Sequence, residues 1–202
     1  ITNICYMTPS TYITSRNKYN VELLVKALRQ GKPYQHTVII AREGGDITKV
    51  EDIKGHSFAF GDIHSTSSHI VPRAMLYEAG IDLDDLDYYD FLGHHDEVAQ
   101  AVLRGEFDAG GVMESTAIKF KDQGLNLLKY SPDIPEFNIC VNKEMPEKEK
   151  ELIKRSLTEM DDSVAEDREI LQSITAAYTG FIEARDSDYD EIRRMMQKLG
   201  LM

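Results

Sequence analysis

Short apolar segments alternate with helical segments through the middle of this chain, and that alternation limits the possible folds more than any other feature. Runs of β-branched and aromatic residues predict strands at residues 37–41, 58–60, 88–91, 108–113 and 125–128. Two amphipathic segments between these strands predict helices that end at Gly80 and Gly105. Strands and helices that alternate in this way favour an α/β sheet with crossover connections.

The flanking segments are expected to complete this fold. Residues 1–7 and 137–141 have the apolar character of buried strands. Asn20 is a suitable N-cap for a helix that ends before Gly31 and carries Val21, Leu24, Val25 and Leu28 on one face. Beyond Pro146 the sequence is almost wholly helical, with a final amphipathic helix at residues 189–199.

The composition excludes several classes of protein. The chain of 202 residues has 23 basic and 35 acidic side chains, a net charge of −12, so sequence-independent binding to nucleic acid is not expected. No apolar run approaches the ~20 residues that span a bilayer. An apolar content of 42% is too high for a disordered chain.

The two cysteines do not indicate a metal or redox motif. Cys5 and Cys140 lie far apart in the sequence and neither belongs to a CxxC pair. We expect two buried free thiols, and a single bridge between them is the alternative.

A row of hydroxyl residues follows the predicted strand at residues 58–60. Ser65, Thr66, Ser67 and Ser68 are consecutive, and they will be called the hydroxyl row. Pro72 belongs in the first turn of the next helix, which places the start of that helix near Ser68 or His69. The unpaired N–H groups and positive dipole end of the helix would then face the row and favour an oxyanion. Ordinary helix capping is the alternative, but capping needs only one hydroxyl.

A second polar cluster, residues 93–96, follows the predicted strand at 88–91. Its two histidines are adjacent, so they point in different directions and make poor joint metal ligands. A hydrogen bond from one of them to an anion is the more natural role. The GxSxG, GxGxxG and GxxxxGK[ST] patterns are absent, so neither hydrolase chemistry nor a nucleotide cofactor is expected. We therefore predict no cofactor, no metal and no catalytic residue.

Five segments in collinear order resemble the substrate-binding component of phosphate/phosphonate ABC transporters. They are STSSHIVP (65–72), YMTPSTY (6–12), DIKGHSFAFGD (52–62), HHDEVAQAVLRGEFDAGGV (94–112) and SPDIPEFNICVNKEMP (131–146). The family pattern for the first segment is STSGH-x-x-P, and here Ser68 replaces the glycine. A serine at this position would narrow or re-aim the anion pocket.

The resemblance implies a type 2 periplasmic-binding fold, with two α/β lobes joined by two crossover strands. Residues 1–33 and 131–202 would be the remainder of lobe 1, with a helical C-terminal tail, and residues 34–130 would be lobe 2. Residues 37–41 and 137–141 would be the paired crossover strands. Family members have further elements before the segment YMTPSTY, so the first lobe is expected to be incomplete in this chain.

The resemblance also implies a set of ligand-binding residues. The hydroxyl row with His69 would surround the phosphoryl oxygens, Tyr12 would donate its hydroxyl from the other lobe, and His95 would donate from a strand-to-helix turn. Glu114 would face the amino group of an aminophosphonate. Phe137 lies where a second acidic residue is expected in aminophosphonate binders, which favours phosphate, phosphite or a simple alkylphosphonate.

The implied function is a solute-binding protein that carries a phosphorus oxyanion to the membrane permease of an ABC transporter. Its expected location is periplasmic or extracytoplasmic, with a lipid anchor as one form of attachment. The main alternative is a ligand-sensing domain of a signalling protein with the same fold. A phosphoesterase that uses His95 and Ser65 is a weaker one.

Overall fold

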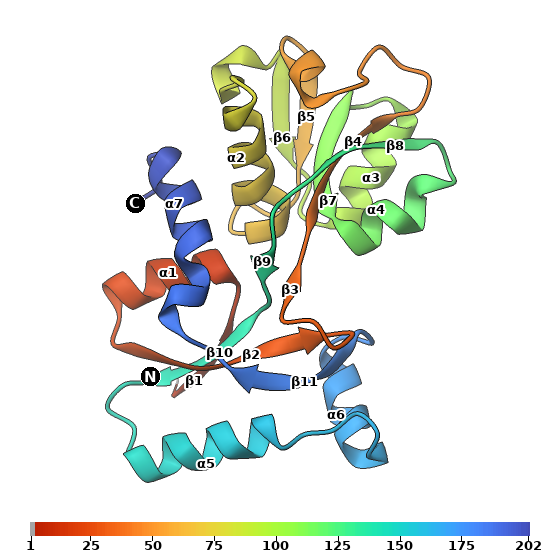
Figure 1. Ribbon diagram of the computed structural model, residues 1–202. Helices are drawn as coiled ribbons and strands as arrows, with labels where there is room; N and C mark the ends of the chain where they lie inside the picture. The colour runs from red at the N-terminus through yellow and green to blue at the C-terminus, as the bar shows by residue number, and fades with distance from the viewer. Residues whose placement is uncertain (1–2) are drawn as a thin grey trace. The chain divides into compact units, whose positions relative to one another are not determined.

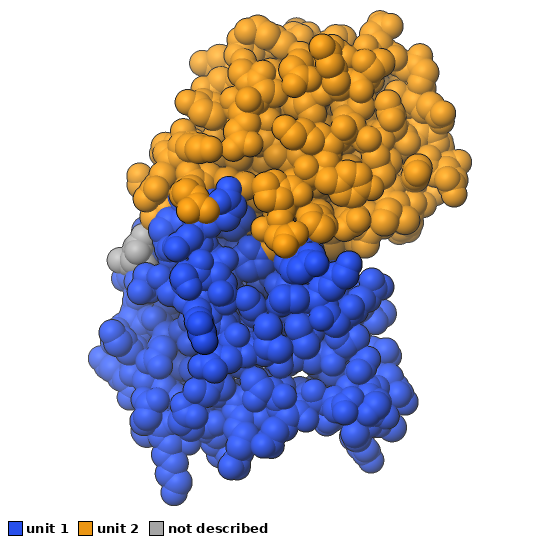
Figure 2. Space-filling model, viewed as in Figure 1, with its two compact units in different colours: residues 1–35, 135–193 blue, residues 36–134, 194–202 orange. Residues whose placement is uncertain are grey.

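The computed structural model describes residues 3–202, except for the side chain of Asn17. These residues form two compact units, which are coloured separately in Figure 2. Unit 1 contains the described residues up to Gln35 together with Pro135–Arg193, and unit 2 contains His36–Ile134 and Arg194–Met202. The chain therefore passes between the units at three points, and the last of them lies inside α7 (Asp190–Lys198).

Unit 1 is built on a four-stranded antiparallel sheet with the order β1-β10-β2-β11. The strands are β1 (Ile4–Met7), β2 (Val21–Arg29), β10 (Asn138–Asn142) and β11 (Tyr178–Glu183). The helix α1 (Pro9–Lys18) lies on one face of this sheet, and α5 (Glu147–Thr158) and α6 (Ala165–Ile174) lie on the other (Figure 1). Buried side chains from β2, β10, β11 and α6 form its core.

The predicted helix after Asn20 is wrong, because this segment is the strand β2. Its apolar residues fit a helical spacing, but β2 pairs with β10 on one side and β11 on the other. Val25 and Ala27 are fully buried in this position. Long-range pairing and burial therefore override the local helical pattern. The helix of this region lies earlier instead, in α1, where Thr8 accepts a hydrogen bond from the amide of Thr11.

The expected helical tail and the expected crossover strands also need correction. Strand β11 interrupts the helices beyond Pro146 and forms an edge of the unit 1 sheet. The strands at residues 37–41 and 137–141 do not pair with each other, because β4 (Thr37–Arg42) pairs with β7 and β8 and β10 pairs with β1 and β2. Pairing near the points of passage is made instead by two short strands, β3 (Tyr34–Gln35) and β9 (Ile134–Pro135).

Unit 2 contains a five-stranded mixed sheet with the order β6-β5-β7-β4-β8. The other strands are β5 (Ser57–Phe60), β6 (Tyr88–Phe91), β7 (Ala109–Met113) and β8 (Leu125–Tyr130). Strand β5 runs parallel to β6 and β7, whereas β4 is antiparallel to β7 and β8. The helix α2 (Val71–Glu78) covers one face, and α3 (His95–Arg104) and α4 (Glu114–Lys121) cover the other (Figure 1). All five strands predicted for this region are confirmed, and Gly105 ends α3 with a positive φ of 72°.

Two glycines in β7 let the helices of unit 2 approach the sheet closely. A Cβ atom at Gly111 would lie 2.4 Å from Cβ of Pro72, and one at Gly110 would lie 2.7 Å from Cγ1 of Val98. The start of α2 therefore rests directly on the backbone of β7. This contact fixes the place where the hydroxyl row meets the sheet.

No helix within residues 3–202 is both long enough and apolar enough to cross a membrane.

Candidate functional site

The hydroxyl row lies in a widened helical turn at the start of α2. Residues Thr66–Ile70 form a π-helical turn, in which the amide of Ile70 donates to the carbonyl of Ser65 at 3.2 Å. The helix thus begins a few residues before the expected position near Ser68 or His69. Pro72 cannot donate to the carbonyl of Ser68, and this carbonyl instead accepts from the amide of Gly61 at 2.9 Å. The wider turn accommodates the proline without ending the helix.

The side chains of the hydroxyl row differ in their solvent exposure. Thr66, Ser67 and Ser68 are each less than 5% exposed, and Ser65 is half-buried. Oγ of Ser65 accepts a hydrogen bond from the amide of Ser68 at 3.1 Å, so Ser65 is the N-cap. Accepting this bond leaves the hydroxyl proton of Ser65 available to donate.

Ser68 faces the backbone rather than an open space. A Cβ atom at Gly61 would lie 2.2 Å from Oγ of Ser68, so only a glycine at position 61 leaves room for this side chain. The serine that replaces the family's glycine is therefore packed into the connection between β5 and the turn.

His69 is also hydrogen-bonded to the connection between β5 and the π-helical turn. Its Nδ1 lies 2.6 Å from the carbonyl of Ile63, and because a carbonyl can only accept, Nδ1 carries the proton. The ring packs edge-on against Phe60 and Phe91. Burial lowers the pKa of His69, so the ring is held in its neutral form.

His95 is the first residue of α3, and the backbone fixes its tautomer in the opposite way. Its Nδ1 accepts a hydrogen bond from the amide of Met113, at the end of β7, at 3.0 Å. An amide can only donate, so Nδ1 is unprotonated and the neutral ring carries its proton on Nε2. The neutral ring therefore has its N–H at Nε2, and the expected hydrogen bond from His95 to an anion stays a prediction.

Thr37, at the start of β4, orients the hydroxyl row and was missed by the sequence analysis. Its Oγ1 donates to the carbonyl of Ser67 at 2.6 Å, and the side chain is fully buried. Its backbone exchanges two hydrogen bonds of 2.9 Å with Ser131. A single threonine at the start of a β-branched run gives no signal of this role in the sequence.

Glu114 is held by a histidine. Its Oε2 lies 3.0 Å from Nδ1 of His36, and Nε2 of the same ring lies 2.9 Å from Oδ1 of Asp133. Both nitrogens of the His36 ring therefore lie within hydrogen-bonding distance of a carboxylate oxygen. One carboxylate oxygen of Glu114 is therefore already occupied within unit 2.

Tyr12, in α1 of unit 1, is also occupied. It is 1% exposed and its hydroxyl donates to Oδ1 of Asp186 at 2.8 Å. Burial, reinforced by this carboxylate, raises the pKa of Tyr12 above its usual value. The same carboxylate binds Arg16 and Arg193, each at 2.9 Å. The Tyr12 proton that the sequence assigned to a ligand is thus directed to Asp186.

An aromatic pair marks the position expected for a second acidic residue. Phe137 stacks on Tyr6 with ring centroids 5.0 Å apart. The neighbouring Glu136 is fully buried and accepts hydrogen bonds from Nε of Arg29 at 2.5 Å and from the hydroxyl of Tyr178 at 3.1 Å. Its charge is balanced inside unit 1.

Comparison with known proteins identifies the family of this chain. A family model described as "ABC transporter, phosphonate, periplasmic substrate-binding protein" matches residues 2–189. The chain belongs to this family. Proteins of the family bind small phosphonates and deliver them to the permease of an ABC transporter, and they work outside the cytoplasm. The resemblance noted in the sequence is thereby confirmed.

Solved structures agree on the fold of this phosphonate-family binding protein. PhnD1 from Prochlorococcus marinus, solved with methylphosphonate, has a TM-score of 0.83 at 20% identity over 99% of this chain and 79% of its own. A binding protein of an ABC phosphonate transporter from Pseudomonas aeruginosa has a TM-score of 0.79 at 18% identity, over 96% of this chain and 67% of its own. XAC2383 from Xanthomonas citri, solved with ATP bound, has a TM-score of 0.85 at 17% identity, over 98% of this chain and 79% of its own. The fold is therefore the type 2 periplasmic-binding fold.

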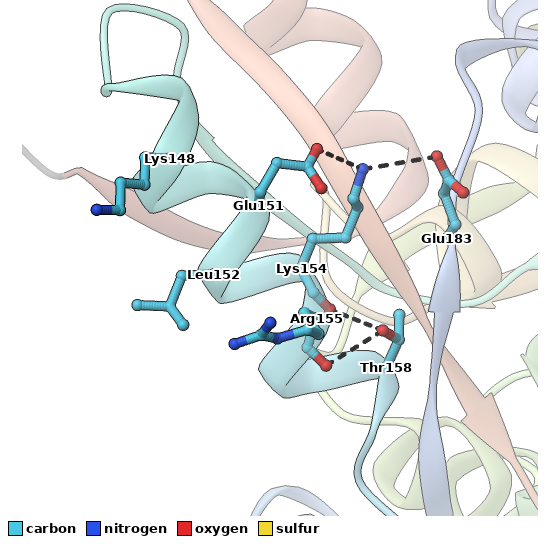
Figure 3. A pocket seen from close by; sticks show the side chains of 7 residues that line it. All are labelled: Lys148, Glu151, Leu152, Lys154, Arg155, Thr158 and Glu183. Atoms are coloured by element: carbon cyan, nitrogen blue, oxygen red, sulfur yellow. Dashed lines mark hydrogen bonds and ion pairs between the residues drawn. The ribbon is translucent and has the colours of Figure 1, made fainter.

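A groove of about 500 Å³ on unit 1 contains none of the predicted ligand-binding residues of this family member (Figure 3). It lies between α5 and β11, and its Lys154 pairs with Glu151 at 2.7 Å and Glu183 at 3.9 Å. Its lining carries three cations, Lys148, Lys154 and Arg155, against two acids, and it contains no residue of the hydroxyl row.

Among residues 3–202, no three histidine, cysteine, aspartate or glutamate side chains converge as ligands for a metal ion. The donors in and beside the hydroxyl row are alcohols, amides and a neutral imidazole, which suit an anion rather than a cation.

Proposed function

We propose that unit 2 binds a phosphorus oxyanion through Ser65, Thr66, Ser67 and Nε2 of His95. The observation that carries this proposal is the row of hydroxyls, three of them buried, at the start of a helix that rests on the sheet. The first amides of a helix have no partner within it, and its dipole favours negative charge. In this role the unit carries the ligand for the permease of an ABC transporter.

Neutral donors suit a protein that must release what it binds. Hydrogen bonds from hydroxyls and amides specify a tetrahedral anion without an ion pair, which would slow release. The net charge of −12 does not prevent this, because distant exposed charges are screened while local dipoles act at contact.

Ser68 and His69 have a structural part in this proposal. The Ser68 side chain is packed against Gly61, and the His69 proton goes to the carbonyl of Ile63. Tyr12 is left out, because its hydroxyl donates to Asp186.

We assign no catalysis to the site. A phosphoesterase would need a base beside Ser65, but Nε2 of His95 carries a proton and is a donor in the neutral ring. His69 carries its proton on Nδ1, so its Nε2 is an acceptor, but the described side chains include no hydrogen bond between His69 and Ser65.

The ligand in this proposal has no amino group. Glu114 already binds His36, and Phe137 supplies an aromatic ring instead of a carboxylate. An ammonium group would therefore lose its water and gain at most one carboxylate oxygen of Glu114. Phosphate, phosphite and simple alkylphosphonates fit better than aminoalkylphosphonates.

We also propose that unit 1 is the remainder of lobe 1 and that unit 2 is lobe 2 of the family fold. This assignment follows the lobes expected at residues 1–33 with 131–202 and at residues 34–130, except that residues 194–202 fall in unit 2 instead of lobe 1.

Calorimetric titration tests the ligand class. Phosphate, phosphite, methylphosphonate, 2-aminoethylphosphonate and sulfate would each be titrated into the purified protein. We expect at least one of the first three to bind, and 2-aminoethylphosphonate to bind at least about tenfold more weakly than methylphosphonate, a difference of about 1.4 kcal/mol. Preferred binding of the aminophosphonate would contradict the assignment of Glu114, and the absence of binding by every phosphorus oxyanion would contradict the site itself.

A further inference from the structure

The two cysteines of the chain face each other across the edge of the unit 1 sheet. Cys5 in β1 pairs directly with Cys140 in the antiparallel strand β10. Directly opposed residues of antiparallel strands place their side chains on the same face of a sheet. Both are free thiols, Cys5 partly exposed and Cys140 buried. Two thiols far apart in the sequence are thereby brought together by the fold.

The hydrogen-bond pattern gives the separation of the two strands at this pair. The amide of Asn142 donates to the carbonyl of Asn3 at 3.0 Å, which makes residues 3 and 142 a hydrogen-bonded pair. The pattern repeats every second residue, so Cys5 and Cys140 form the next such pair, with Cα atoms about 5.5 Å apart. Disulfides span Cα separations of about 4.4–6.8 Å.

The separation of Cys5 and Cys140 is close to the one that a disulfide prefers but slightly too large. Opposed residues in a hydrogen-bonded pair have Cβ atoms near the upper end of about 4.5–5.5 Å, whereas a disulfide prefers about 3.5–4.5 Å. The strands must therefore move slightly together. Strand β1 is at the edge of the sheet, and the register of β10 against β2 already shifts between Ile139 and Cys140. Both features make a local adjustment feasible, and the resulting bond is strained and easily reduced.

We propose that Cys5 and Cys140 form a reversible disulfide by thiol–disulfide exchange with a low-molecular-weight or protein disulfide. Proteins of this family work outside the cytoplasm, where such donors persist. The Cys5 thiolate attacks the donor disulfide, forms a mixed disulfide and releases one donor thiolate. The Cys140 thiolate then attacks the Cys5 sulfur and releases the second. The protein loses two protons and two electrons, and the two electrons reduce the donor to two thiols.

The surroundings of the two thiols set this order of attack. Cys5 is the more accessible sulfur. Burial raises the pKa of Cys140 to about 12, so its thiolate is rare near neutral pH. Closure of the internal bond is therefore the slow step, and it should accelerate as the pH rises.

The test begins with the reduced, full-length chain in a buffer of oxidised and reduced glutathione. Samples are quenched with N-ethylmaleimide and analysed by intact mass and peptide mapping. We expect a monomer that has lost two hydrogen atoms, takes up no maleimide and contains a peptide joining Cys5 to Cys140. We also expect dithiothreitol to restore both thiols without a denaturant. Two alkylated thiols, a glutathione adduct on Cys5 without closure, or a disulfide-linked dimer would each overturn the proposal.

A matched variant tests whether closure of the disulfide requires the β1 thiol to lie directly opposite Cys140. The double substitution Cys5→Ser with Ile4→Cys leaves one thiol on each strand but moves the β1 thiol to the opposite face of the sheet. It alters a side chain that is already 49% exposed, so folding should be preserved. We expect at least tenfold slower closure in this variant, and equally fast closure would contradict the assignment.

Discussion

Two histidines of unit 2 are fixed in opposite tautomers by the backbone groups that each one contacts. A carbonyl accepts from Nδ1 of His69, and an amide donates to Nδ1 of His95. The resemblance implied a contact with the anion at both positions. In the neutral ring His95 therefore carries its proton on Nε2, whereas His69 carries its proton on Nδ1 and donates it to a carbonyl. The partner atom, and not the presence of a histidine, decides which of the two can serve a ligand.

Replacing His95 should therefore weaken the affinity for a phosphorus oxyanion. In His95→Ala the oxyanion loses one N–H donor, and we expect a loss of about 1–3 kcal/mol in binding free energy by calorimetry. His94→Ala is the matched control, because His94 is exposed and its side chain makes no capping hydrogen bond. Equal losses in both variants would contradict the role of His95.

Thr37 offers a test of how the row is oriented. In Thr37→Val the carbonyl of Ser67 loses its hydroxyl donor while the shape of the side chain is kept, so we expect the affinity to fall about fivefold or more. Thr37→Ser restores the donor and should recover most of the affinity. If the serine variant binds as weakly as the valine variant, packing rather than the hydrogen bond is responsible.

The buried His69 predicts a loss of stability in acid. Its pKa in the folded protein lies below the unfolded value of 6.5, so the unfolded chain binds the proton more readily. The free energy of unfolding should therefore fall as the pH drops through about 6.5 towards the folded value, by at most about 1.4 kcal/mol per pH unit from this group. Urea unfolding at about pH 7.5 and about pH 5.5 measures this slope, and His69→Gln should have a smaller one. An identical slope in the variant would contradict the assignment.

At the scale of elements, the sequence was sufficient to predict those strands and helix ends that depend only on their own residues. The strands of unit 2 and the end of α3 at Gly105 followed from β-branched runs and glycine positions. Strand β2 could not be predicted, because its partners β10 and β11 come from distant parts of the sequence. The π-helical turn was missed for a related reason, since it depends on the bond between Gly61 and the carbonyl of Ser68. The hydroxyl row was predictable because all of its members are consecutive.

The contact of α2 with β7 predicts the effect of a single methyl group. Gly111→Ala would place a Cβ atom 2.4 Å from Pro72, so we expect a loss of about 1–3 kcal/mol in unfolding free energy. Gly45→Ala is the control, because its added Cβ would meet only a carbonyl oxygen at 3.4 Å. Urea denaturation of both variants measures the difference. A Gly111→Ala protein as stable as the control would show that α2 does not rest tightly on the strand.

At the scale of the whole molecule, two different kinds of evidence support the account. The family and the fold come from a match over residues 2–189 and from structural neighbours of low identity. The proposed ligand class rests on acidic side chains that already have partners within their own unit: one oxygen of Glu114 bonds to His36, and Glu136 pairs with Arg29. The resemblance singled out Glu114 but not Glu136, and the sequence could not identify the partner of either, because each pair joins residues far apart in the chain.

The central claim is that the hydroxyl row binds a phosphorus oxyanion, and Thr66→Ala tests it most directly. Calorimetric titration of methylphosphonate, or of phosphate if that binds more tightly, would compare this variant with the wild type and with Thr66→Ser. We predict a loss of about 1–3 kcal/mol for alanine and near wild-type affinity for serine, since serine keeps the hydroxyl. An unchanged Kd in a correctly folded Thr66→Ala protein would contradict the claim.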